Sequence, residues 1–200
     1  MMKLFLSPTS PFARKVKVAL MEKNLYPDVE EIPVDPWSSP AELIRANPLC
    51  QVPTLVTGEG LALANSDSIL DWLESRFPEP ALRPANDPDR GRAMAIAAQA
   101  HGLMQYTVDI VLERRRPASQ RSATFTDRRM AAIGRVVTAL GDRFLPTPGF
   151  GIDGIGVACA LGYLDLRLPE YPWRERSPSL TRWFSGVASR PSLQASAPPV

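Results

Sequence analysis

Residues 3–14 decide the fold, and they read Lys3-Leu4-Phe5-Leu6-Ser7-Pro8-Thr9-Ser10-Pro11-Phe12-Ala13-Arg14. The apolar run at the start of this stretch predicts a short strand, and the two prolines after it predict a tight turn. Ser10 suits the N-cap of a helix, and Pro11 at the first helical position removes no donor that the helix would use. Apolar residues then recur with helical spacing at Phe12, Val16, Ala19 and Leu20. The stretch therefore predicts a strand, a turn and a helix with one buried face.

The rest of the first eighty residues continues this alternation. Strand patterns cover residues 29–34, 53–57 and 61–64, and helical patterns cover residues 40–46 and 66–77. The second and third of these strands are joined by Gly58-Glu59-Gly60, which is typical of a hairpin. The order βαβαββα predicts a small mixed sheet with helices packed against it.

A proline-rich segment separates this part from the remainder of the chain. Residues 78–88 contain four prolines and no periodic pattern, which is typical of a linker between domains. Every longer periodic segment after it is helical, and we expect helices over residues 89–113, 126–144, 152–168 and 180–188. We therefore predict an α/β domain over residues 1–77, a linker over 78–88 and an all-helical domain over 89–200.

Two features of the helical part give further expectations. The segment 152–168 is apolar almost all round, which predicts the buried central helix of a bundle. The tail from Gln194 to Val200 has no such pattern, and we expect it to fray.

Composition excludes several classes of protein. With 44% hydrophobic and 22% charged residues, the chain has a globular and not a disordered composition. No apolar run approaches the roughly 20 residues of a membrane-spanning helix. The N-terminus lacks the core of roughly 7–15 apolar residues found in a secretory signal. We therefore expect a cytoplasmic protein with no membrane partner.

The charge distribution and the small number of cysteine and histidine residues exclude further classes of protein. Residues 1–80 hold 7 Lys/Arg and 11 Asp/Glu, whereas residues 81–200 hold 16 and 10. This positive excess is too small to indicate nucleic-acid binding. Two cysteines, Cys50 and Cys159, are too few for a disulfide framework or a four-thiolate metal site. A single histidine, His101, excludes a multi-histidine metal site, so we expect no nucleic acid and no metal.

The helix expected to begin at Pro11 offers an N-terminus that favours anions. Thioredoxin-like folds place a reactive thiol at this point, and glutaredoxins carry Cys-Pro-Tyr/Phe-Cys there. This chain has Ser10-Pro11-Phe12-Ala13 instead, which excludes dithiol exchange at this position. The Ser10 hydroxyl either caps the helix or donates a hydrogen bond to the thiolate of a ligand. Positive potential from Arg14, Lys15 and Lys17 would support the second role.

Two further segments allow both a structural and a ligand-binding interpretation. Pro53 is either an ordinary proline at the entry of an edge strand or a cis proline beside a ligand site. In the second case Val52 offers its backbone N–H and C=O to a peptide ligand. Ser66, at the start of the next helix, either serves as its N-cap or helps the first-turn N–H groups to hold a carboxylate.

These three segments, in this order and at these separations, resemble the glutathione S-transferase superfamily. The resemblance covers nearly the whole chain and includes Gly162-Tyr163-Leu164-Asp165 in the expected central helix. It implies a thioredoxin-like domain, then a helical domain, in a cytosolic homodimer with a role in detoxification. It also implies an enzyme without a metal that activates the thiol of glutathione, its co-substrate, for attack on a small apolar electrophile. The alternatives are a glutathione-dependent isomerase or dehalogenase on the same fold, or a non-catalytic protein-interaction module.

The resemblance also implies roles for individual residues. Ser10 would activate the thiol, with Thr9 as its neighbouring rival. Phe12 would lie among the glutathione contacts, Gln51 would reach the glycyl end, and Val52 would pair with the cysteinyl backbone before a cis Pro53. Asn65 and Ser66 would bind the γ-glutamyl end.

The chain departs from the family pattern at two places. Asn65 stands where the family usually has Asp or Glu, and a neutral amide forms a weaker hydrogen bond with the glutamyl ammonium than a carboxylate does. Gly151 and Gly154 stand where the family has a Ser/Thr-x-x-Asp cap on its central helix. Phe150 and Ile155 keep the hydrophobic staple at that helix start, so the expected fold is unchanged.

Three other features have structural and functional interpretations. His101 lies on the helix that lines the second-substrate pocket in the family, where it acts either as an acid or base or as a helix-surface or interface residue. Arg114-Arg115-Arg116 is either a solvated helix end or an anion-binding group. Cys50 is next to the expected glutathione contacts but not at a helix N-terminus, so we expect an inert thiol.

Overall fold

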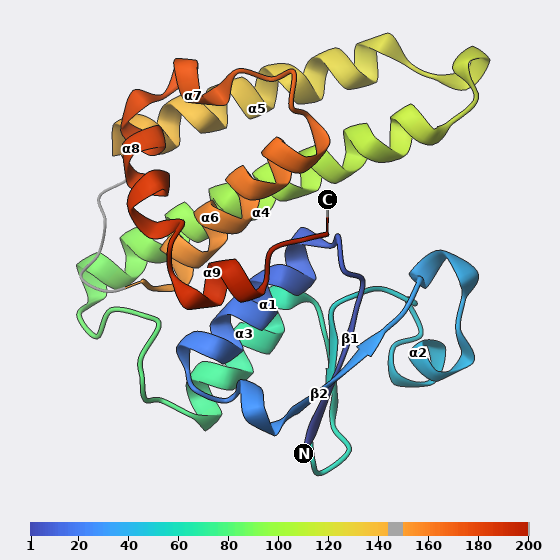
Figure 1. The fold of residues 1–200 in the computed structure, drawn as a ribbon, viewed down its shortest axis with the longest axis vertical. Coiled ribbons are helices and arrows are strands. Elements are labelled where there is room, and N and C mark those ends of the chain that lie inside the picture. Colours follow the sequence, from blue (N-terminus) through green and yellow to red (C-terminus); the bar gives the residue numbers. More distant parts are fainter. Residues whose placement is uncertain (144–149, 200) are drawn as a thin grey trace. The chain divides into compact units, whose positions relative to one another are not determined.

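The computed structural model describes residues 1–143 and 150–199, which form two compact units (Figure 1). Met1–Arg83 and Arg190–Val200 make up the first, here called the sheet unit. Pro84–Ser189 make up the second, here called the helical unit. Across the described residues, no helix is both long and apolar enough to cross a membrane.

The sheet unit contains the small mixed sheet that the sequence predicts. Its strands are β1 (Met2–Leu6), β2 (Val29–Pro33), β3 (Thr54–Val56) and β4 (Ala62–Ala64). Their order is β2-β1-β3-β4, with β1 parallel to β2 and antiparallel to β3, and with β3 antiparallel to β4. Phe5 faces Thr54, and Thr54 faces Ala64. The C-terminal ends of β1 and β4 and the N-terminal end of β3 therefore share one edge of the sheet.

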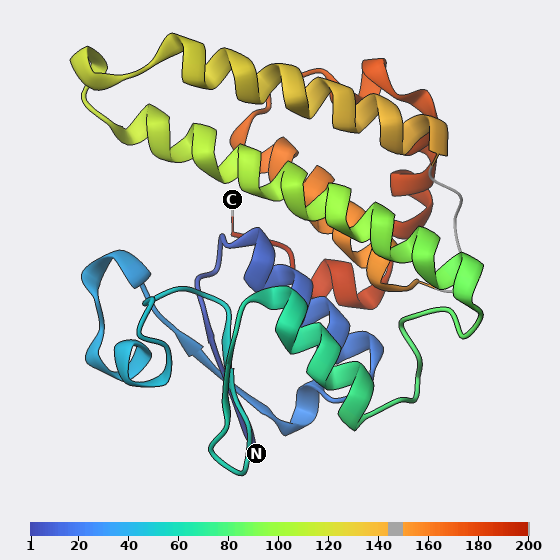
Figure 2. The same ribbon diagram turned by 180° about the vertical axis from the view of Figure 1, so that it is seen from behind.

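Helices cover both faces of this sheet. The longer helices α1 (Pro11–Glu22) and α3 (Ser66–Arg76) lie side by side on one face, and α2 (Ala41–Ala46) lies on the other (Figure 2). Two short 3-10 helices, Tyr26–Asp28 and Pro36–Ser38, flank β2. The core between the sheet, α1 and α3 includes fully buried Leu4, Val16, Leu20, Leu55, Ile69 and Leu73. Burying such a side chain contributes about 1.5–3 kcal/mol, so these periodic apolar positions hold the unit together.

The C-terminal segment of the chain belongs to the sheet unit. Residues Pro191–Ala195 form a short helix, α9, which packs against α1. Leu193 is buried, and its carbonyl accepts a hydrogen bond of 3.1 Å from Arg14 Nη2. The expectation that the tail frays from Gln194 is therefore wrong up to the buried Ser196, because these contacts order it. Val200, the last residue of that prediction, lies outside the described residues.

The helical unit is built around α6 (Ile152–Arg167), which packs mainly against α4 (Asp87–Arg115). Twelve of the residues in α6 are buried, so the prediction of a central buried helix is confirmed. Gly156 allows the close approach of the two helices, because a Cβ there would lie 3.3 Å from the Cβ of Ala100. Gly151 caps α6 without a side-chain hydrogen bond, and Phe150 and Ile155 are both buried, as a hydrophobic staple requires.

The remaining helices of this unit are α5 (Ala123–Arg143), α7 (Trp173–Arg176) and α8 (Pro178–Val187), with a 3-10 turn at Ala118–Gln120. The expected end of α5 at Phe144 lies outside the described residues. The helix α7 is too short to show a periodic pattern, and the sequence did not predict it. It is held by Asp165, which accepts hydrogen bonds from Trp173 Nε1 at 2.7 Å and from the Arg174 guanidinium. The helix α4 begins two residues before the expected Asp89, because Asn86 caps it by accepting from the Asp89 N–H at 3.0 Å.

Candidate functional site

The three segments singled out in the sequence lie at one edge of the sheet. The turn of residues 7–10 follows β1, Val52 and Pro53 precede β3, and Asn65 follows β4. The register that joins Phe5, Thr54 and Ala64 places these three connections next to one another. Strand pairing alone therefore assembles residues that are far apart in the sequence.

Ser10 forms the N-cap of α1, as the sequence predicts. Its backbone is extended, and its Oγ accepts a hydrogen bond of 3.2 Å from the Ala13 N–H. The Ser10 N–H donates to Ser7 O at 3.0 Å, which closes the turn after β1. Among residues 1–143 and 150–199, no acceptor takes the hydroxyl hydrogen of Ser10. Capping therefore uses only the acceptor function of this hydroxyl and leaves its donor function available to a ligand.

The two other candidates at this helix start are Thr9 and Phe12. Thr9 is half-buried in the turn, and its hydroxyl makes no hydrogen bond within the described part of the chain. Phe12, in the first turn of α1, is also half-buried. Ser10 is the hydroxyl whose position is fixed by helix geometry.

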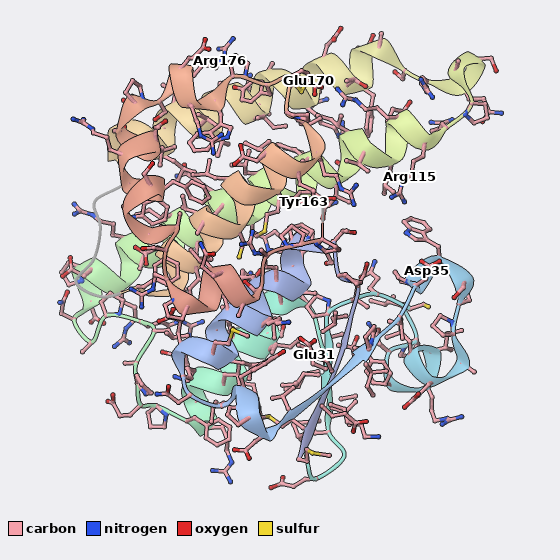
Figure 3. The ribbon with its side chains drawn as sticks, viewed as in Figure 1. Glu31, Asp35, Arg115, Tyr163, Glu170 and Arg176 are labelled. Carbon is pink, nitrogen blue, oxygen red and sulfur yellow. The ribbon has the colours of Figure 1, made fainter. Side chains whose placement is uncertain are left out.

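The positive potential expected from α1 is reduced by ion pairs. Lys15 Nζ lies 2.5 Å from Asp67 Oδ1, and Lys17 Nζ lies 2.9 Å from Glu31 Oε1. Glu31, which lies on β2, is labelled in Figure 3. Although burial opposes the shift, hydrogen bonding to Glu31 and Tyr26 raises the pKa of Lys17 above its usual value. The Arg14 guanidinium instead contacts neutral groups, Ser196 Oγ and the Leu193 carbonyl. Lys15 and Lys17 are thus compensated locally, and the helix N-terminus itself is the main source of positive potential.

The segment before β3 has the backbone arrangement that the sequence predicts. The Val52–Pro53 peptide bond is cis, which confirms that prediction. Gln51 is exposed, and its carbonyl accepts hydrogen bonds from Thr54 Oγ1 at 2.8 Å and from Asn47 Nδ2 at 3.1 Å. Val52 makes no backbone hydrogen bond to any residue that the structure describes. Its N–H and C=O can therefore pair with an extended ligand.

The start of α3 excludes one of the two interpretations given for Ser66. The N-cap is Asn65 and not Ser66, because Asn65 Oδ1 accepts from the Asp67 N–H at 2.8 Å. Asn65 has a φ of 72°, a conformation that asparagine adopts more readily than most residues. Ser66 is the first helical residue and is 2% exposed. Its Oγ has no hydrogen-bond partner among the described residues.

An unsatisfied buried hydroxyl is costly, by about 1–3 kcal/mol, and in native proteins it usually has a partner. Ser66 Oγ and the N–H groups of the first turn of α3 both favour a carboxylate. The N-cap interpretation of Ser66 is therefore wrong, and anion binding by Ser66 stays a prediction.

Sequence reasoning missed the contacts that join the two helices of the site. Lys15 on α1 is buried and reaches Asp67, the residue after Ser66, on α3. About two helical turns further along both helices, Lys23 Nζ lies 2.5 Å from Glu74 Oε1 and 2.8 Å from the Pro80 carbonyl. No local pattern signals pairs whose partners are about fifty residues apart. These contacts fix the start of α3 relative to α1.

The other candidates lie on the helical unit or make structural contacts. His101 is half-buried on α4. The three arginines of the run are exposed, which confirms a solvated end of α4. Arg114 pairs there with Glu170 at 2.5 Å and Arg116 with Glu113 at 3.2 Å. The Sγ of Cys50 donates to the Pro36 carbonyl at 3.4 Å. Among the residues with defined positions, no three His, Cys, Asp or Glu side chains gather as metal ligands would.

Comparisons with known proteins point to one family. The family model for the N-terminal domain of glutathione S-transferases matches residues 9–76. The chain is 34% identical over 203 residues to YibF of Escherichia coli (strain K12), an uncharacterized GST-like protein, with 99% of each chain covered.

Solved structures agree with this match. A glutathione transferase family member from Pseudomonas fluorescens Pf-5, with bound glutathione, has a TM-score of 0.94 and 34% identity over all of both chains. A glutathione S-transferase from Methylobacterium radiotolerans JCM 2831, in complex with glutathione sulfonate, has a TM-score of 0.93 and 31% identity. That match covers all of this chain and 95% of the other.

Proposed function

The chain belongs to the glutathione S-transferase superfamily, and on that premise we propose that it binds glutathione and activates its thiol for attack on a small apolar electrophile. The observation that carries this proposal is the geometry of Ser10. Its Oγ is fixed at the N-terminus of α1 by the Ala13 N–H, while its hydroxyl hydrogen is available for a thiolate. Similar proteins that have been solved with bound glutathione or glutathione sulfonate support the choice of ligand.

The chemistry requires a thiolate at neutral pH. A free thiol has a pKa near 8.5, so only a few per cent is ionised at about pH 7. A hydrogen bond from the Ser10 hydroxyl favours the charged form, and so does the positive end of the α1 dipole. Both lower the pKa of a thiol placed there and raise the fraction of the nucleophile that reacts.

The remaining contacts would hold the peptide along the sheet edge. Val52 offers its unpaired N–H and C=O to the cysteinyl backbone, in the manner of an added strand. The exposed Gln51 side chain is available to the glycyl end, and Ser66 Oγ to the γ-glutamyl carboxylate. Phe12 and Thr9 belong to the same end of α1, with Thr9 as the alternative thiol-activating group.

We further propose a cytoplasmic homodimer that uses no metal and serves detoxification. Sedimentation tests the dimer, and we expect a species of twice the 22.0 kDa chain mass at micromolar concentration. A 22.0 kDa species under those conditions would contradict it.

Calorimetric titration with glutathione, followed by an assay with an activated aryl halide, tests the function directly. We expect saturable binding, and conjugation above the uncatalysed rate. Binding without conjugation would favour an isomerase, a dehalogenase or an interaction module. Absence of binding, with the protein folded by circular dichroism, would overturn the proposal.

A further inference from the structure

The start of α3 differs chemically from what the γ-glutamyl end of glutathione presents, since that end carries both a carboxylate and an ammonium group. We propose that this site recognises the carboxylate and does not recognise the ammonium. Thiol peptides that lack the amino group would then bind as well as glutathione. The inference rests on the proposed function, and it names the class of thiol that the site accepts.

The groups presented at this helix start are mainly hydrogen-bond donors. Asn65 is exposed, and its Oδ1 is occupied by the Asp67 N–H at 2.8 Å, which leaves its Nδ2 donors for a ligand. The buried Ser66 hydroxyl has no partner among the described residues, and the first-turn N–H groups of α3 add further donors. A carboxylate satisfies such a set, whereas an ammonium group, which only donates, does not.

The carboxylates of α3 that could bind an ammonium group already have cationic partners. The helix α3 carries three acidic residues, and each has a cationic partner: Asp67 with Lys15, Asp71 with Arg83, and Glu74 with Lys23. Asp67 is the one adjacent to Ser66. Its partner Lys15 has a side chain that is 4% exposed, so this lysine cannot be displaced easily into water.

Lys15 therefore acts as a specificity-determining residue. It compensates the one carboxylate in the first turn of α3, and a ligand ammonium near that turn would be repelled by Lys15 as much as it is attracted by Asp67. The amino group of the ligand would stay in water, where its hydration is undisturbed. Its removal from the ligand should then change the affinity little.

Three ligands separate the two charged groups: glutathione, its glutaryl analogue (carboxylate kept, amino group absent) and its 4-aminobutyryl analogue (amino group kept, carboxylate absent). Calorimetry on the full-length protein gives the three dissociation constants. We expect the glutaryl analogue to bind within fivefold of glutathione. We expect the 4-aminobutyryl analogue to bind at least tenfold more weakly, because it leaves the donors unsatisfied.

Two variants should make the site bind glutathione more tightly than its glutaryl analogue. Asn65→Asp keeps a good N-cap residue and adds a carboxylate, while Lys15→Met keeps the buried volume and releases Asp67 from its partner. Each should make glutathione bind about tenfold better than the glutaryl analogue, as a charge-assisted hydrogen bond would. Should Lys15→Met fail to fold, Asn65→Asp carries the test alone.

Matched controls are available on the same chain. Asn86→Asp makes the same change at the N-cap of α4, and Lys17→Met removes a lysine of α1 that pairs with Glu31 and not with α3. Both should leave the ratio of the two dissociation constants as in the parent protein.

The outcomes distinguish this inference from the function on which it rests. If the folded parent protein binds glutathione but binds the glutaryl analogue more than fivefold more weakly, the inference is overturned and the proposed function stands. If it binds neither peptide, the proposed function fails. A third outcome is that neither the parent protein nor Asn65→Asp distinguishes glutathione from the glutaryl analogue. The start of α3 is then not the glutamyl site, and the inference is overturned as well.

Discussion

The principal helices of the two units differ in their contacts, because buried lysines add ion pairs to the apolar core of the sheet unit. In the sheet unit, α1 is tied to α3 by the buried lysines Lys15 and Lys23, and to α9 by Glu22 and Arg190. In the helical unit, the central helix α6 packs through an almost continuous apolar surface. Charged ties require specific partners and geometry, whereas apolar packing requires mainly shape and volume.

This difference bears on function, because the charged ties of the sheet unit lie beside the candidate site. Lys15 ends next to Ser66, and Lys23 fixes the other end of the same pair of helices. A change in these residues should therefore alter ligand recognition as well as stability. A change inside α6 should alter stability and leave glutathione affinity unchanged.

The largest effect is expected from Glu74→Ala. The Lys23 side chain is fully buried, and without Glu74 its charge has no carboxylate partner. Breaking a buried pair from one side costs about 3–5 kcal/mol of folding free energy. Urea unfolding of Glu74→Ala measures this loss, with Glu42→Ala at an exposed position as a control that should change stability by at most about 0.5 kcal/mol. A loss below about 1 kcal/mol would show that the Pro80 carbonyl suffices for Lys23.

Leu161→Ala tests how much the apolar packing of α6 contributes to stability. Leu161 is fully buried in α6, and its truncation should cost about 2–5 kcal/mol through lost burial and the cavity left behind. Urea unfolding gives the stability, and calorimetry gives the glutathione affinity, which we expect to stay within twofold. A large change in glutathione affinity would show that packing inside α6 affects ligand binding as well as stability.

Ser10→Ala tests the catalytic assignment. One charge-assisted hydrogen bond is worth about 1.5–3 kcal/mol, and one pKa unit corresponds to about 1.36 kcal/mol. Removing the hydroxyl should therefore raise the pKa of the bound thiol by roughly one to two units and slow turnover by about 10–100-fold. Glutathione affinity should change little.

Thr9→Ala is the matched variant for that experiment, and ultraviolet titration of the bound thiolate is the measurement. We expect a much smaller shift than in Ser10→Ala, because no helix contact fixes the Thr9 hydroxyl. A raised thiol pKa in Thr9→Ala together with an unchanged one in Ser10→Ala would transfer the role to Thr9. No shift in either would assign the effect to the helix N-terminus alone.

The sequence predicts the order of elements well where periodicity and local chemistry agree. The turn into α1 is an example, because serine at the N-cap and proline after it act through nearest neighbours. The sheet edge that assembles Ser10, Val52 and Ser66 depends on the strand pairing, and the sequence indicates it only through the family resemblance. The cis bond before Pro53 was predicted from the family resemblance and not from local sequence, where an ordinary proline was the alternative.

What the sequence does not predict depends on distant partners. Both Asn65 and Ser66 are good N-cap residues, and the positive φ that selects Asn65 is set by the path of the chain from β4. The short helix α9 depends on Arg14, which lies 179 residues from Leu193 in the sequence. The short helix α7 depends on Asp165, only eight residues from Trp173, but its four residues are too few to show a periodic pattern. The Lys15–Asp67 pair leaves no local pattern, although it lies at the candidate site.

The smallest loss of stability is expected when the ion pair between α1 and α9 is removed. The dependence of this loss on pH distinguishes a charged contact from an apolar one. Burial raises the pKa of the Glu22 carboxyl, but hydrogen bonds from Arg190 and Ser192 outweigh it and hold the pKa below its usual 4.5. A lowered folded-state pKa adds stability above the ordinary pKa, and this stability is lost as the pH falls through the folded value. The pair is partly exposed, so Glu22→Gln should cost at most about 1 kcal/mol near pH 7. Urea unfolding at about pH 7 and about pH 3.5 should show this cost shrinking in acid, while that of Leu161→Ala stays constant. A Glu22→Gln cost that is equal at both pH values would show that the carboxylate charge does not stabilise the α1–α9 contact.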